Sequence, residues 1–98
     1  MSNKRILREK MDRLVNEATM AKGLVDTSDA SYLEKYKNNM ETVIKLIDSD
    51  TIPASDGGVI GATSALSERK RLSSLISLYD AAADVDLYYS QNCKTWAV

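Results

Sequence analysis

Two stretches of this chain repeat apolar residues with a seven-residue period, and this spacing constrains the fold more than any other feature. In the first stretch the steps alternate between four and three residues, through Leu7, Met11, Leu14, Ala18, Ala21 and Val25. In the second they alternate between three and four, through Leu33, Tyr36, Met40, Val43 and Ile47. Such spacing places the apolar side chains on one face of an α-helix that packs against another helix. The sequence therefore predicts helices over about 3–25 and 29–48.

The connection between these two predicted helices is short and rich in capping residues. Gly23 suits the end of the first helix, and the Asp26-Thr27-Ser28-Asp29 run offers side chains that can cap the start of the second. A turn this brief cannot return the chain to the start of the first helix. We therefore predict an antiparallel helical hairpin.

The last segment predicts a third helix that is longer than the other two. Residues 48–62 form a linker with the only proline and three of the four glycines, and residues 63–91 have helical composition. An unbroken helix over 63–91 would span about 43 Å, against roughly 30 Å for each of the others. Either it breaks near residues 83–84, or its wide apolar arc extends beyond the hairpin. We favour the second alternative, in which another chain covers the arc.

The predicted fold is thus all-α, a single helical domain over residues 1–98 with a tail over 92–98. An antiparallel helical hairpin and a longer third helix form a three-helix bundle that self-association completes, with a dimer as the first expectation. A chain of 98 residues has a modest core of its own, which favours burial against a partner.

Composition argues against several classes of function. The sequence has no histidine and one cysteine, so it lacks a Ser-His-Asp triad, the usual zinc ligands and a disulfide framework. The closest acidic pairs in the sequence are two residues apart and would point to different faces of a helix. We expect no enzyme activity, no cofactor and no metal. The unpaired Cys93 and the lack of a long apolar segment favour a cytoplasmic location without a membrane span.

Basic residues gather at two places although the net charge is only −1. The candidate anion contacts are Arg5, Arg8, Arg69, Lys70 and Arg71. The first two lie in the opening turns of a helix, where the helix dipole disfavours cations. They either face an anionic partner or form a solvated face with neighbouring acids. Glycines 57, 58 and 61 before a helix start resemble part of an anion site, but the Gly-Lys-Ser/Thr ending of a phosphate loop is absent.

Aromatic residues gather near the C-terminal end of the sequence. Tyr88 and Tyr89 are followed by Trp96, and aromatic groups of this kind are enriched in protein interfaces. Together with Val85 they form the predicted partner-binding surface. The alternative is that the tail covers its own bundle.

These observations predict a non-catalytic protein that binds and occupies a partner protein, acting as a small homo-oligomer in an interaction or regulatory role. Two alternatives remain: a nucleic-acid-binding regulator that uses the local basic patches, and an oligomer that sequesters a small anionic ligand. Small binding proteins of this kind include phage- or plasmid-encoded modulators of host machinery, which is an association by class only. No motif in these residues identifies a protein family.

Overall fold

The computed structural model describes residues 3–53, 55 and 58–93, and all regular structure in this part of the chain is helical. The all-α prediction is therefore confirmed. The elements are α1 (Asn3–Ala21), the 3₁₀-helix η1 (Lys22–Leu24), α2 (Thr27–Asp48), α3 (Ala62–Ser67), α4 (Lys70–Ser73) and α5 (Ile76–Asn92).

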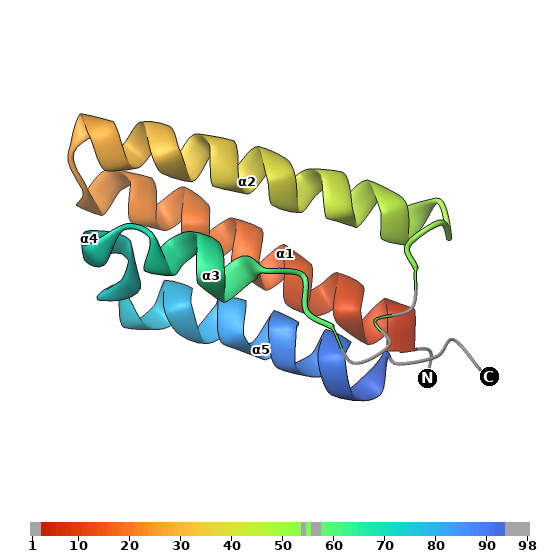
Figure 1. Ribbon diagram of the computed structural model, residues 1–98. Coiled ribbons are helices and arrows are strands. Elements are labelled where there is room, and N and C mark those ends of the chain that lie inside the picture. The colour runs from red at the N-terminus through yellow and green to blue at the C-terminus, as the bar shows by residue number, and fades with distance from the viewer. Residues whose placement is uncertain (1–2, 54, 56–57, 94–98) are drawn as a thin grey trace.

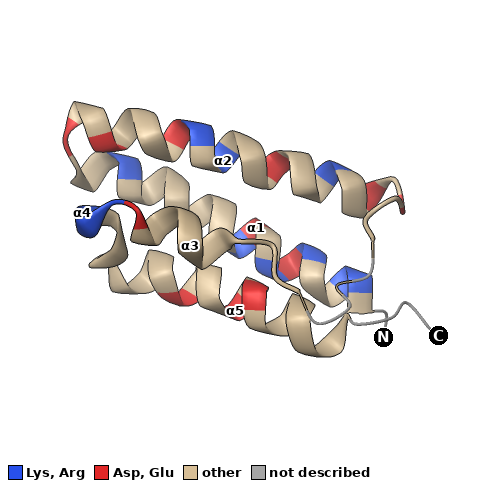
Figure 2. Cartoon of the chain, viewed as in Figure 1, with Lys and Arg blue, Asp and Glu red and all other residues tan. Residues whose placement is uncertain are grey.

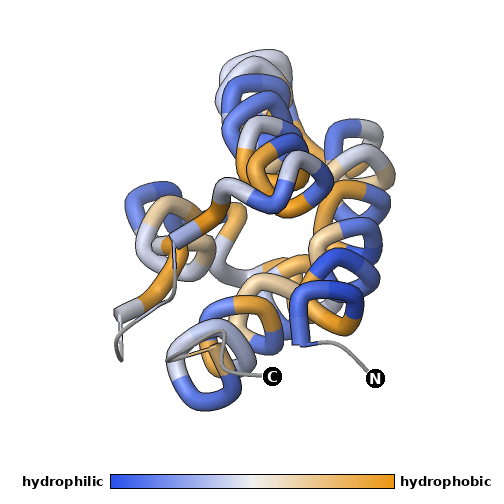
Figure 3. Tube along the Cα trace, turned by 90° about the vertical axis from the view of Figure 1, so that its right-hand side faces the viewer, coloured by the Kyte–Doolittle hydropathy of each residue, from blue (hydrophilic) through white to orange (hydrophobic). Residues whose placement is uncertain are grey.

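The helices run up and down beside one another (Figure 1). Helix α2 returns antiparallel to α1, α5 packs against α1, and α3 runs antiparallel to α5 beside it. Figure 3, which looks nearly along the helices, shows them around a shared centre. The start of α1 and the end of α5 meet, because the Asn3 side-chain amide donates to the Asn92 carbonyl at 2.6 Å. Residues 22–26 and the α4 segment lie at the opposite end of the bundle.

The core lies between α1, α2 and α5 and extends under α3. Helix α1 contributes its seven-residue seam, whose members Leu7, Met11, Leu14 and Ala18 have no exposed surface. The facing positions of α2 and α5 are buried against it, among them Leu33, Tyr36, Leu78, Ala82 and Val85. Ile52 in the linker is also buried, which holds the described part of the linker on the bundle.

The prediction of one unbroken helix over 63–91 is wrong. The segment forms three helices, with breaks at Arg69 and Leu75, where the backbone is extended. The alternative break near residues 83–84 is wrong too, because both residues lie inside α5. With 17 residues against the 19 of α1, α5 has no overhang, and the length mismatch that favoured a covering chain disappears. Helices α1 and α3 cover the inner face of α5.

This correction changes the role expected of Val85. The side chain has no exposed surface, so it belongs to the core of the chain's own bundle. We expect Val85→Asp to lower the free energy of unfolding by more than about 3 kcal/mol, because it buries an unpaired charge. Urea unfolding followed by circular dichroism measures this.

The matched control is Leu87→Asp, two residues further along α5, where the side chain is 56% exposed. It should change the free energy of unfolding by less than about 1 kcal/mol. Equal stability of the two variants would contradict the burial of Val85.

Candidate functional site

A buried carboxylate from α5 caps the start of α3. Asp86 is 5% exposed, and its two oxygens accept hydrogen bonds from the backbone N–H groups of Gly61, Ala62 and Thr63 at 2.9–3.2 Å and from the Thr63 hydroxyl at 2.9 Å. Gly61 has a φ of 91°, a left-handed conformation that favours glycine. The start of α3 thus has the geometry of an anion site, but the anion is the chain's own Asp86. Asp86 therefore occupies the N–H groups of residues 61–63, and Gly57, the first glycine of the predicted anion site, lies outside the described residues.

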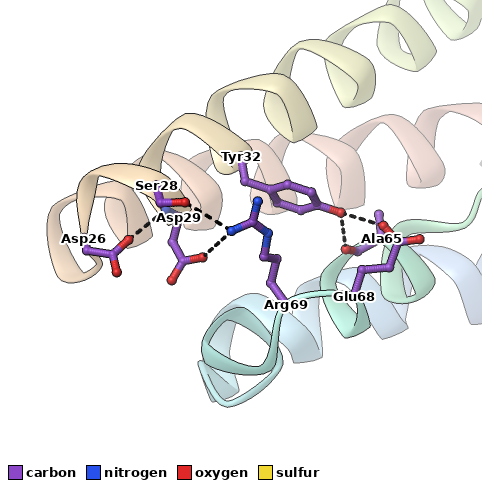
Figure 4. A network of polar contacts seen from close by, with 7 residues as sticks. All are labelled: Asp26, Ser28, Asp29, Tyr32, Ala65, Glu68 and Arg69. Atoms are coloured by element: carbon purple, nitrogen blue, oxygen red, sulfur yellow. Dashed lines mark hydrogen bonds and ion pairs between the residues drawn. The ribbon is translucent and has the colours of Figure 1, made fainter.

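Arg69 joins the α3–α4 turn to the start of α2 (Figure 4). Its guanidinium Nη1 donates to Ser28 Oγ at 3.2 Å and lies 3.4 Å from Asp29 Oδ1, and its Cζ lies 4.7 Å from the centre of the Tyr32 ring. The Tyr32 hydroxyl lies 2.6 Å from the Ala65 carbonyl and 3.1 Å from the Glu68 carboxylate. Burial, and then the contact with Glu68, raise the pKa of Tyr32. The network is intramolecular, so Arg69 serves as a clamp between helices.

The basic start of α1 faces the acidic end of α2. Arg8 Nε lies 2.8 Å from Asp48 Oδ1, and Lys4 pairs with Asp50. Figure 2 shows the basic bands of α1 and the acidic end of α2 at the same end of the bundle. The hydrogen bond with Asp48 is the main reason that the pKa of Arg8 is raised. Carboxylates of the same chain thus pair with Lys4 and Arg8 at this end of the bundle.

The structure does not bring the five candidate anion contacts together. Arg5 and Arg8 lie near the start of α1, whereas Arg69, Lys70 and Arg71 lie at the other end of the bundle. Arg5 forms an ion pair with Glu9 at 3.6 Å. Lys70 and Arg71 are exposed on α4, and Arg71 Nη2 donates to the Leu24 carbonyl at 3.4 Å. No continuous basic surface joins the two groups among the described residues.

The residues of the predicted partner-binding surface face mostly inward. Val85 is in the core, and Tyr89 is buried, with its hydroxyl donating to the Pro53 carbonyl at 2.6 Å. Tyr88 is half-buried beside α1, with its hydroxyl 3.1 Å from Asn3 Oδ1. Trp96 lies outside the described residues. Val85 and Tyr89 therefore belong to the core of the bundle and not to an exposed contact surface.

An exposed apolar groove lies at the end of the bundle where α1 gives way to η1 and α5 begins. Its volume is about 370 Å³. Met20, Leu24 and Ile76 line it and are 61%, 64% and 76% exposed. Sequence analysis missed this groove. A signal was present, because Met20 and Leu24 are apolar residues outside the seven-residue seam of the first helix.

A second groove of about 330 Å³ lies between α3 and α5, where Val59 and Leu87 are 57% and 56% exposed. The described residues contain no group of three or more histidine, cysteine, aspartate or glutamate side chains that could hold a metal ion. None of the helices in the same residues combines the length and hydropathy that a membrane span requires.

The fold and the site define an all-α bundle with several internal ion pairs, in which five large exposed apolar side chains line the two grooves: Met20, Leu24, Ile76, Val59 and Leu87. Comparisons with protein-family models, with curated proteins and with solved structures each give no match to this chain.

The capping role of Asp86 gives a stability prediction. Asp86→Ala should lower the free energy of unfolding by about 2 to 4 kcal/mol, because it leaves the N–H groups at the start of α3 without their acceptor. Asp84→Ala is the control, because it makes the same substitution in the same helix and so changes helix propensity equally. It removes only a partly exposed ion pair between Asp84 and Lys10, with an N–O distance of 2.9 Å. Its expected cost is below about 1 kcal/mol. Equal costs in thermal or urea unfolding would refute the capping role.

Cys93 is a free thiol with no exposed surface, and burial raises its pKa from 9.0 to about 11. At pH 8 the folded protein should react with iodoacetamide at least about 100-fold more slowly than the protein in urea, since the thiolate is the reacting form. The unfolded thiol ionises first as the pH rises, so this group's contribution to stability is present below pH 9 and is lost between pH 9 and about 11. Rapid labelling of the folded protein would contradict this burial.

Proposed function

We propose that this protein is a non-catalytic interaction or regulatory protein that acts by occupying a surface of another polypeptide, as a small homo-oligomer. The contact surface is the apolar groove lined by Met20, Leu24 and Ile76. The observation that carries the proposal is the gathering of three large, mostly exposed apolar side chains at one site. Exposed apolar groups gathered in this way mark interaction surfaces on soluble proteins.

The start of α5 supports this proposal because it departs from the local rules for helix starts. The N-cap position is Leu75, which makes no side-chain capping bond, and Ile76 follows with most of its surface exposed. A serine, threonine, aspartate or asparagine at the cap would stabilise the helix by about 1 kcal/mol. Leu75 packs partly against the core, whereas Ile76 is mostly exposed, and an exposed apolar residue that gains little inside the monomer is expected at functional sites.

Charge supports an apolar rather than an electrostatic mode of binding. Arg5, Arg8 and Arg69, three of the five candidate anion contacts, are engaged in ion pairs within the chain. A nucleic-acid-binding regulator, the alternative from the sequence, would instead need clustered basic groups for phosphate. The free thiol of Cys93 supports the cytoplasm as the proposed location.

Affinity capture from the native host with three baits tests the proposed function. The baits are the unaltered protein, Ile76→Asp in the groove, and Leu87→Asp as an equally polar change outside it. Proteins that bind through the groove, including untagged copies of this chain, should be lost from the Ile76→Asp bait by at least about 30-fold. They should remain on the Leu87→Asp bait when quantified by mass spectrometry.

Salt separates the proposal from its nucleic-acid alternative. A complex made through apolar contacts should change little as salt rises, whereas phosphate contacts weaken steeply. Retention that is equal for both variants, or that disappears with salt and with nuclease, would count against the groove as the contact surface.

A further inference from the structure

The groove lies at the end of the bundle opposite to the last described residue of the chain. Cys93 is the last described residue, and the length of α5 places it about 25 Å from Ile76. Ser55 in the linker lies at that same end of the bundle, because its N–H donates to the Cys93 carbonyl at 2.8 Å. The described end of α5 and the described linker residue beside it therefore lie away from the groove.

The two ends of the groove carry opposite charges. Glu17 lines the end nearer the middle of the bundle, and Asp80 lies one turn beyond Ile76 on α5 in the same direction. At the other end Arg71 reaches the Leu24 carbonyl, and Lys70 precedes it on α4. None of these four side chains forms an ion pair within the described residues. The groove is thus an apolar strip with an acidic end and a basic end.

We infer that the occupant of the groove is a second copy of this chain, packed antiparallel about a twofold axis. This inference rests on the proposed function and names the partner of the same site. A twofold contact must be self-complementary, because the same patch meets itself in reverse. Reversal places the Glu17 end of each copy against the partner's basic end, while the strip of Met20, Leu24 and Ile76 meets its counterpart.

The overall charge of the chain permits this association. The net charge is −1, so two copies repel each other little. The unpaired charges at the groove ends would then set the direction and register of the dimer, as charges at interface rims do. Any partner of the groove would need an apolar strip whose acidic and basic ends run in the opposite direction. A second copy of this chain, turned by the twofold axis, presents such a strip.

Sedimentation equilibrium of the purified full chain over a wide concentration range tests the inference. The unaltered protein should dimerise, and Ile76→Asp should raise the dimer Kd by at least about 30-fold, because a twofold interface carries the change twice. Leu87→Asp should leave Kd within about threefold. Circular dichroism of each variant checks that the exposed substitution leaves the fold intact.

Charge reversal gives a second and independent measurement. Glu17→Arg and Arg71→Glu should each raise the dimer Kd by about tenfold, because each places like charges together across the interface. The double variant should return Kd to within about threefold of the original value, since opposite charges then meet again. Glu9→Arg is the control, because Glu9 already pairs with Arg5 inside the chain. Combining Glu9→Arg with Arg71→Glu should not return the dimer Kd to its original value.

Each outcome decides between the two proposals. A monomer at every concentration, or a dimer that neither Ile76→Asp nor charge reversal weakens, would overturn the homodimer inferred here. If that monomer still retained another protein through Ile76 in the capture experiment, the proposed function would stand while the identity of the partner would be wrong.

Discussion

The arrangement of the second half of the molecule depends on one buried carboxylate. Asp86 lies on α5 but satisfies the N–H groups at the start of α3, so it fixes where the chain re-enters the bundle after the linker. The direction of α3 follows from this contact, since its start is held beside the middle of α5 (Figure 1). The Tyr36 hydroxyl then donates to the Ala62 carbonyl at 3.0 Å, and its burial, with the nearby Asp86 charge, raises the pKa of Tyr36. A displaced α3 would leave all these polar groups buried without partners.

The sequence was sufficient to predict the all-α class and most of the buried stripes of α1 and α2, because those depend on local periodicity, although Ile44 is buried in place of the predicted Val43. It failed over 63–91, where no glycine or proline interrupts the run of helix-forming residues. The breaks come from contacts distant in sequence: Arg69 is extended and its guanidinium reaches Ser28 and Asp29, about forty positions earlier. Helix propensity depends on local sequence and contains no information about such distant contacts. Over 63–91 the tertiary contacts therefore outweighed the helix propensity.

The candidate site was equally hard to predict, for a related reason. A run of basic residues predicts nearby anionic groups, but it does not show whether these groups belong to the same chain or to a partner. Here Asp48 supplies an anion for Arg8, and Asp86 occupies the start of α3 that resembled an anion site. The apolar side chains of the groove come from two parts of the chain, Met20 and Leu24 from the first and Ile76 from the last. Met20 and Leu24 fall outside the seam of the first helix and so indicate an apolar patch, but only the fold brings Ile76 beside them.

The same breaks that shorten α5 also create the groove. Had residues 63–91 formed one rod, Leu75 and Ile76 would lie within a helix and not at an exposed start. The turn at Ser74 and Leu75 instead ends α4 and exposes Ile76 beside Leu24. The internal clamp thus accompanies the break at Arg69, and the exposed groove accompanies the break at Leu75. The apolar arc predicted for a long third helix is mostly buried in the bundle, as at Leu78, Ala82 and Val85, whereas Ile76 is exposed at the end of the bundle, where another polypeptide can reach it.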